Sequence, residues 1–266
     1  MYKEKPVLIK LMHADPELQK RLAWFHQQPG CNWGIARSGV EDLPELTMTR
    51  QGVFLTNGAK QLPFHPSMAL IRLMNLLSGR SDRYLEAAQL KAGDSLIDAT
   101  LGLGTEALLG AWAVGDQGRV LALEQSPILA AFVQDGLNHF TELVPKAKNI
   151  TKQAAWNALA RASGRIEVRW GEHLSYLKSI PSRSVDVVYF DPMFRYTCKQ
   201  SDSMLPLHRW SDHKSLDHEA ILEACRVARN RVVLKERKNS SEFRRLGFDI
   251  LRGGQYSSVD YGVILV

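Results

Sequence analysis

The segment from Val185 to Phe194 constrains the fold of this chain more than any other. Its sequence, Val-Asp-Val-Val-Tyr-Phe-Asp-Pro-Met-Phe, is an apolar run that ends abruptly in an acid and a proline. A strand this apolar is normally buried on both faces of a parallel sheet, and ligands of such sheets bind just beyond the carboxyl ends of the strands. We therefore expect Asp191 to stand at a functional site, with Pro192 stiffening the turn and Phe194 offering a ring for stacking. An ordinary Asp-Pro turn after a strand is the alternative.

Strands and helices alternate regularly after Gly93. We expect strands at 95–99, 119–124, 165–170, 185–190 and 231–236, and helices at 104–114, from about 127, at 151–162, 173–179 and 217–229. This alternation predicts an α/β fold with a doubly wound, Rossmann-like and mostly parallel sheet. The last two apolar segments, 248–255 and 259–266, have no helix between them, which predicts a C-terminal antiparallel hairpin strand.

The region before this alternation is harder to interpret. Residues 1–60 are expected to form a small N-terminal appendage, with a helix that begins at Asp15-Pro16 and a strand near 53–55. Residues 61–266 are expected to form the main domain, which includes a leading helix at about 67–78 whose apolar residues recur at helical spacing.

Composition excludes several classes of protein. No apolar run approaches the roughly 20 residues that cross a bilayer, and we find no secretion signal. The three cysteines are scattered, with neither a disulfide framework nor a zinc spacing. We therefore expect a cytoplasmic protein that binds no membrane and no metal.

The net charge of +6 modestly favours a polyanionic partner. Basic residues concentrate after the Asp-Pro turn, and they are Arg195, Lys199, Arg209, Lys214, Arg226, Arg229, Arg231, Lys235, Arg237, Lys238, Arg244 and Arg245. We expect Arg226 and Arg229 to lie on a solvated helix face. The residues expected to contact phosphates are Lys199, Arg209, Lys235 and Arg237.

The turn Asp98-Ala-Thr-Leu-Gly-Leu-Gly104 can bring backbone close to a ligand, because glycine has no Cβ to obstruct it. Gly102, Gly104 and Ala107 also satisfy a relaxed dinucleotide-binding pattern, and Glu124 lies 22 positions after Gly102, near the place of a ribose-binding acid. Taken alone, this turn is therefore also compatible with a nicotinamide-dependent dehydrogenase. Asp98 argues against it, since its charge would repel a pyrophosphate but suit the ammonium of an amino-acid moiety.

The order of these signals resembles the class I S-adenosylmethionine-dependent methyltransferases over roughly residues 86–266. Those signals are an acid and glycines after the first strand, acids after the second and third, and Asp-Pro-x-aromatic after the fourth. More narrowly, 98–104, 188–194 and 231–236 together resemble the bacterial small-subunit ribosomal RNA guanine-N2 methyltransferase family. The resemblance implies S-adenosylmethionine as cofactor and an RNA substrate, as free ribosomal RNA or in a small-subunit particle.

The resemblance also implies roles for single residues. Asp98, Gly102 and Gly104 would meet the methionine end of the cofactor, Glu124 the ribose hydroxyls, and Glu172 the adenine. The full expected cofactor set is Asp98, Thr100, Gly102, Gly104, Glu106, Glu124, Gln125, Glu172 and His173. For Glu106, a favourable charge at a helix N-terminus is an equally good interpretation.

The expected catalytic residues are Asp191, Pro192 and Phe194. Asp191 and the Pro192 carbonyl would accept hydrogen bonds from the target amine and offset its developing positive charge, while Phe194 would stack on the base. Met193 stands where many amine methyltransferases carry a second proline, so guanine-N2 is favoured over adenine-N6. A small-molecule methyltransferase and a non-catalytic RNA-binding protein with a retained pocket stay open. His65 either caps the active site or packs as a loop histidine between prolines.

Overall fold

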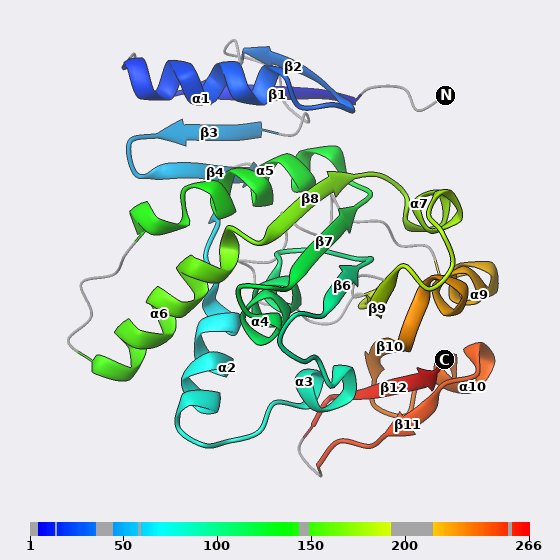
Figure 1. The fold of residues 1–266 in the computed structure, drawn as a ribbon. Helices are drawn as coiled ribbons and strands as arrows, with labels where there is room; N and C mark the ends of the chain where they lie inside the picture. The colour runs from blue at the N-terminus through cyan, green and yellow to red at the C-terminus, as the bar shows by residue number, and fades with distance from the viewer. Residues whose placement is uncertain are drawn as a thin grey trace.

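The computed structural model describes residues 5–13, 15–35, 45–57, 60–143, 149–192, 215–254 and 257–266. In this part of the chain, a five-stranded sheet near the N-terminus is followed by a seven-stranded sheet (Figure 1). The larger sheet carries the helices that position the candidate site.

The seven-stranded sheet has the predicted doubly wound topology. Its strands are β6 (Ser95–Asp98), β7 (Arg119–Glu124), β8 (Ile166–Trp170), β9 (Val185–Phe190), β10 (Ala228–Arg237), β11 (Asp249–Leu251) and β12 (Val259–Leu265). The spatial order is β11-β12-β10-β9-β6-β7-β8. Strands β6 to β10 run parallel, whereas β12 is antiparallel to both β10 and β11. The predicted Rossmann-like sheet and its antiparallel C-terminal strand are confirmed.

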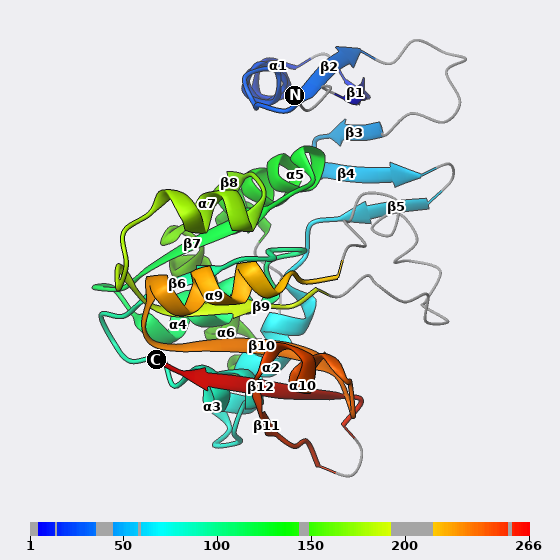
Figure 2. The same cartoon turned by 90° about the vertical axis from the view of Figure 1, so that its right-hand side faces the viewer.

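Helices cover both faces of this sheet (Figure 2). One face carries α2 (Ser67–Leu77), α3 (Arg83–Ala88), α4 (Thr105–Val114), α5 (Pro127–Asn138) and α6 (Ile150–Ser163), with the short 3₁₀ helix η1 (Phe140–Leu143) between α5 and α6. The other face carries α7 (His173–Ser179), α9 (His218–Val227) and α10 (Glu242–Leu246). Among the described residues, no helix combines the length and apolarity that crossing a bilayer requires.

Local sequence signals account for most element boundaries. Helix α5 begins at Pro127, which has a fixed φ suited to a first helical turn. The helix expected over 217–229 ends earlier, at Val227, because the chain passes directly into β10 at Ala228. The first residues of β10 pair irregularly with β9, with a register shift between Ala228 and Arg231. Residues 228–229, which helical periodicity alone assigned to the helix, therefore belong to the strand, because β10 begins to pair with β9 at Ala228.

The N-terminal sheet holds more structure than its sequence predicted. It consists of β1 (Lys5–Leu11), β2 (Cys31–Ile35), β3 (Glu45–Thr49), β4 (Gly52–Asn57) and β5 (Lys60–Pro63), in the order β2-β1-β3-β4-β5, with α1 (Pro16–His26) between β1 and β2. The expected helix start is confirmed, because the Asp15 side chain accepts hydrogen bonds from the amides of Glu17 and Leu18. The strand near 53–55 is β4. The other strands were missed because each offers at most two buried apolar side chains, such as Val7 and Ile9 in β1 or Cys31 and Trp33 in β2.

One cluster of buried side chains runs from the small sheet into the large one. The Phe64 ring, just after β5, meets the Phe132 and Phe140 rings edge to face at 6.4 and 6.2 Å. Arg21 of α1 forms a two-pronged ion pair with the buried Asp135 of α5, at 2.5 and 2.6 Å. Because these contacts tie the two sheets together, the division of the chain at about residue 60 stays a prediction.

Candidate functional site

A cavity of about 470 Å³ lies at the carboxyl ends of β6, β7 and β9. This is the edge of a doubly wound sheet at which ligands bind, beside the point where strand order reverses. The residues that sequence analysis selected and that line this cavity are Thr100, Gly102, Glu106, Glu124, Gln125, Glu172, His173, Asp191, Pro192 and Lys235. The sheet topology therefore gathers residues from five separate segments at one place.

The turn after β6 forms one wall of the cavity. Gly102 has φ +54° and Gly104 has φ +78°, conformations that residues with a Cβ rarely adopt. A Cβ at Gly102 would meet only the Thr100 carbonyl oxygen, at 3.9 Å, so the backbone here is open to a ligand. Gly104 is not among the lining residues; its amide closes the turn by donating to Leu101 O at 2.8 Å.

Asp98 lies beneath this turn rather than on the cavity wall. Asp98 is 1% exposed, and its carboxylate accepts a hydrogen bond from the Thr100 amide at 3.1 Å. Burial raises the pKa of Asp98 well above its ordinary value, and the nearby carboxylates of Glu106 and Asp191 act in the same direction. A contact between Asp98 and the methionine ammonium stays a prediction, and the described site adds a structural role for this residue.

Glu124 ends β7 and reaches back to the glycine turn. Its carboxylate accepts hydrogen bonds from the Gly102 amide at 3.1 Å and from the Ser126 amide at 2.9 Å. The Glu124 residue lines the cavity at the place where the resemblance puts the ribose hydroxyls, and that contact stays a prediction. Gln125, the next residue, also lines the cavity, and its carbonyl accepts from the Trp170 indole at 3.1 Å.

Glu172 and His173 line the cavity after β8. Glu172 caps α7, because its carboxylate accepts hydrogen bonds from the Leu174 and Ser175 amides at 3.0 and 2.8 Å. Burial works to raise the pKa of Glu172, but these hydrogen bonds outweigh it and hold the pKa below its ordinary value. The His173 ring packs edge-on against Phe190 at 5.6 Å. The contact of Glu172 with adenine stays a prediction, and its role as a helix cap was not expected from the sequence.

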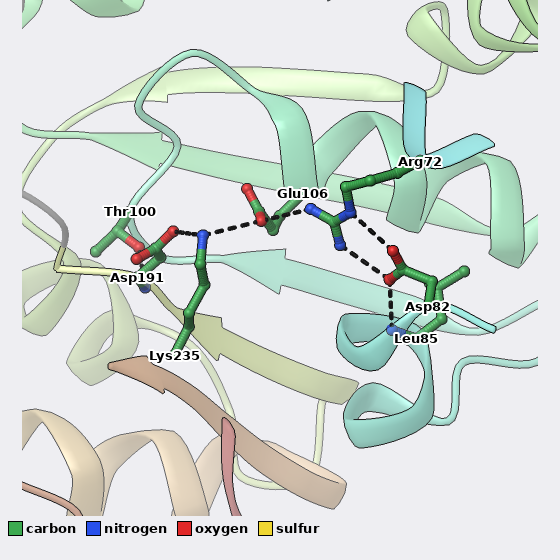
Figure 3. Close-up of polar contacts among 7 residues, drawn as sticks. All are labelled: Arg72, Asp82, Leu85, Thr100, Glu106, Asp191 and Lys235. Carbon is green, nitrogen blue, oxygen red and sulfur yellow. Dashed lines mark hydrogen bonds and ion pairs between the residues drawn. The ribbon is translucent and has the colours of Figure 1, made fainter. Parts of the chain in front are cut away.

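Asp191 follows β9 and is held from two sides (Figure 3). Its amide donates to Thr100 Oγ1 at 2.6 Å, and its Oδ2 accepts from Lys235 Nζ at 2.6 Å. Burial raises the pKa of Asp191 to about 6, although the Lys235 ammonium works to lower it. The carboxyl group is therefore mostly ionised at neutral pH. Pro192 lies beside it on the cavity wall.

Arg72 of α2 is the main residue of the site that sequence analysis missed. It forms a two-pronged ion pair with Asp82 at 2.7 and 2.9 Å and donates to Glu106 Oε1 at 2.8 Å (Figure 3). Its only sequence signal is that it is the single charged residue of the apolar helix Ser67–Leu77. A lone charge on a mostly apolar helix needs a partner where the helix packs against the core, and this signal points to Arg72.

His65 and Met68 line the same cavity as Arg72. The His65 ring meets the Trp156 ring edge to face at 5.6 Å. Burial and the charge of Lys152 lower the pKa of His65 below its ordinary value, which favours a neutral ring. The two interpretations of His65 are thus compatible, since the ring both packs against a neighbour and borders the cavity.

Of the residues predicted to contact the substrate base or its phosphates, only some can be located relative to the cavity. Phe194, Lys199 and Arg209 lie outside the described residues. Arg237 is exposed near the end of β10 and does not line the cavity. The Lys235 side chain is only 16% exposed and is bonded to two carboxylates, an arrangement that the predicted phosphate contact did not anticipate.

The expectation that Arg226 and Arg229 lie on a solvated helix face was wrong for Arg229 and incomplete for Arg226, which lies on α9 but is half-buried. Arg226 donates to the carbonyls of Leu177 and Ile180 at 2.8 and 3.0 Å, which closes the end of α7. Arg229 belongs to β10 and pairs with Asp186 at 3.1 Å. Part of the positive charge in this segment therefore holds the fold together and is not available to a partner.

Several known proteins are similar to this chain. It is 34% identical over 230 residues to the uncharacterised protein YpiP of Bacillus subtilis, in an alignment that covers 86% of this chain and 84% of that protein. It is 30% identical over 232 residues to a protein of Shewanella amazonensis named ribosomal RNA small subunit methyltransferase J, covering 85% of this chain and 86% of that protein. A protein of the same name from Aeromonas salmonicida is 32% identical over 162 residues, and the alignment covers 59% of each chain.

The sequence model of the SAM-dependent methyltransferase family matches residues 62–246. This match identifies S-adenosylmethionine as the cofactor and sets aside the nicotinamide dinucleotide that the glycine turn alone had left open. The cavity fits this cofactor, because the unobstructed backbone at Gly102 and the carboxylate of Glu124 border the same space. Within the described ranges, no group of three or more potential metal ligands is present. The chain belongs to the family of S-adenosylmethionine-dependent methyltransferases.

Proposed function

We propose that this methyltransferase acts on an exocyclic amine of a nucleobase in RNA, with guanine-N2 of small-subunit ribosomal RNA as its target. The observation that carries the proposal is the position of Asp191 and Pro192, which follow β9 and line the cofactor cavity beside the glycine turn. Relatives named ribosomal RNA small subunit methyltransferase J support an RNA substrate.

The chemistry needs an acceptor for the N–H groups of the target. The lone pair of an exocyclic amine is delocalised into the base ring, so the amine is a poor nucleophile. Hydrogen bonds to the Asp191 carboxylate and the Pro192 carbonyl would draw the nitrogen toward tetrahedral geometry and offset the positive charge that develops on it. S-adenosylmethionine supplies the electrophilic methyl group, and the protein supplies position and charge.

Proton balance is compatible with the same residue. As the N–C bond forms and the C–S bond of the cofactor breaks, one proton must leave the amine nitrogen. An ionised Asp191, with its pKa of about 6, can accept that proton from a methylated ammonium and return it to solvent. Phe194, Lys199, Arg209 and Arg237 remain our proposed contacts with the base and the phosphates.

The test is single-turnover transfer of labelled methyl to naked small-subunit RNA and to small-subunit particles. We expect Asp191→Asn to abolish transfer and to leave the dissociation constant for S-adenosylmethionine within a few-fold of wild type. Asp249→Asn, at an exposed position on β11, is the matched control and should transfer normally. Near-normal transfer by Asp191→Asn would exclude the proposed mechanism.

Mass spectrometry of the labelled nucleosides identifies the target. N2-methylguanosine is expected, in RNA from cells that carry the gene and not in RNA from cells that lack it. N6-methyladenosine would retain the amine mechanism and contradict the choice of base. Labelled small molecules without labelled RNA would contradict the choice of substrate class.

A further inference from the structure

Strand order places a buried layer of polar groups on the face of the large sheet that α4 covers. Leu234 of β10 pairs in parallel register with Phe190 of β9, so Lys235 and Asp191, the next residues, stand side by side. Side chains alternate along a strand, so both point to the face opposite Phe190 and Leu234. Those two residues pack in the cluster beneath α7 and α9. The lysine and the aspartate therefore meet on the α4 side.

Lys235 connects two buried carboxylates. Its Nζ lies 2.6 Å from Asp191 Oδ2 and 3.2 Å from Glu106 Oε1 (Figure 3). The side chains of Lys235, Asp191 and Glu106 are 16%, 9% and 10% exposed. Such low exposure removes most of the water that would otherwise solvate these charges, so each depends on its partners. The contact is an internal ion pair and not a surface charge.

The charges of this layer are unequal in number. Three carboxylates, those of Asp82, Glu106 and Asp191, contact two cations, Arg72 and Lys235. Arg72 is occupied by Asp82 and Glu106. In the described part of the chain, Lys235 is thus the cation that contacts Asp191, and Glu106 fixes the position of that cation.

The Asp191 carboxylate is held at one oxygen. Its Oδ2 accepts from Lys235, and its amide is fixed by Thr100, whereas no described residue donates a hydrogen bond to Oδ1. Asp191 also lines the cavity. A carboxylate held in this way presents an oriented acceptor to a ligand.

We propose that Lys235 is a positioning residue for methyl transfer: bridging Glu106 and Asp191, it keeps the Asp191 carboxylate ionised and oriented, so that Oδ1 receives the target amine. The inference rests on the proposed function for the identity of the amine, but the ion pair itself can be tested without RNA. It gives Lys235 a role different from the predicted phosphate contact. It also gives Glu106 a role in holding Lys235 and not the cofactor.

Several other groups act on Asp191 besides Lys235. They are Glu106 of α4, Glu236 of β10, Asp98 of β6, Tyr189 of β9 and Tyr261 of β12. Glu106 and Glu236 work to raise the pKa of Asp191, and burial raises the pKa of both tyrosines, which keeps them neutral near pH 7. Removal of the Lys235 charge and removal of the Glu106 charge should therefore move the titration of Asp191 in opposite directions.

The experiment is a pH titration of the full chain labelled with ¹³C at aspartate carboxyl groups, with the Asp191 resonance assigned by its loss in Asp191→Asn. In wild type we expect a midpoint near pH 6. Lys235→Met should raise the midpoint by roughly 1–3 pH units, the usual effect of losing an adjacent opposite charge. Lys235→Arg should keep it near wild type, and Glu106→Gln should lower it. Lys178→Met removes an exposed, ion-paired lysine on α7 and should change nothing.

The same variants are then assayed for single-turnover methyl transfer across pH. The rate of Lys235→Met should reach half its maximum at a correspondingly higher pH, while S-adenosylmethionine affinity stays within a few-fold of wild type. An unchanged Asp191 midpoint, or an unchanged rate profile, in folded Lys235→Met overturns the inference. Should Lys235→Met fail to fold, an upward or absent shift in Glu106→Gln overturns it instead. The expected carboxyl shifts in a protein that methylates no RNA would support the ion pair and refute the proposed function.

Discussion

Replacement of Arg72 by methionine should lower the free energy of unfolding more than replacement of any solvent-exposed charged residue. Arg72 is 17% exposed at its side chain and makes three charged hydrogen bonds, two to Asp82 and one to Glu106. Removal of one partner of a buried ion pair costs about 3–5 kcal/mol, because the other partner keeps its desolvation penalty. The lower end applies here, since Glu106 retains Lys235 and Asp82 still caps α3 through the Leu85 amide. We therefore expect a loss of about 3 kcal/mol.

Urea unfolding followed by circular dichroism measures this loss. At an m-value of about 3 kcal/mol per molar urea, a loss of about 3 kcal/mol lowers the midpoint by about 1 M. Arg161→Met, at an exposed position in the last turn of α6, is the matched control and should stay within about 0.5 kcal/mol of wild type. An Arg72→Met midpoint indistinguishable from that of Arg161→Met would refute the assignment of Arg72 as a buried ion-pair partner.

The pH dependence of this effect has a definite sign. Burial works to raise the pKa of Asp82, but the hydrogen bonds and charge of Arg72 outweigh it and hold the pKa below its ordinary value of 3.8. The ionised Asp82 thus contributes stability above pH 3.8, and this contribution is lost as the pH falls through the lower folded-state pKa. The difference in unfolding free energy between wild type and Arg72→Met should have its largest value at pH 7 and should become smaller below pH 4.

Three further predictions follow from other parts of the structure. Glu124→Ala should weaken S-adenosylmethionine binding by roughly 1.5–3 kcal/mol in calorimetry, because a charged acceptor is lost; unchanged affinity would leave Glu124 as a support for the turn only. Gly136→Ala should lower the unfolding free energy by about 1–3 kcal/mol, since its Cβ would lie 2.1 Å from Phe64 Cγ, whereas Gly164→Ala, with its nearest contact at 3.9 Å, should be neutral. Binding of small-subunit RNA should weaken with salt, with a slope of log K against log salt of about −0.7 for each phosphate contact to a single strand; a flat dependence would point to a small-molecule substrate.

The sequence alone was sufficient for the class of the fold and for the segments that build the site. Strands β6 to β10 and their helices were recognisable because apolar periodicity and turn residues are local properties of the chain. The Asp-Pro turn after Phe190 and the glycines at 102 and 104 were recognisable for the same reason. The parallel order of those strands then requires that their carboxyl ends meet at one edge. A site formed by Asp191, Glu124 and the glycine turn follows from these two facts.

The roles of single charged residues depended on the tertiary structure. The pairing of Lys235 with Asp191 requires that β9 and β10 be neighbours in a particular register, and a one-residue shift would turn Lys235 to the other face. Arg72 reaches Glu106 only because α2 packs beside α4. In the sequence, Lys235 and Arg237 are alike as basic residues near a predicted RNA site. Burial made one an internal counter-ion and left the other exposed, because the free energy of a charge depends on the water and the partners around it.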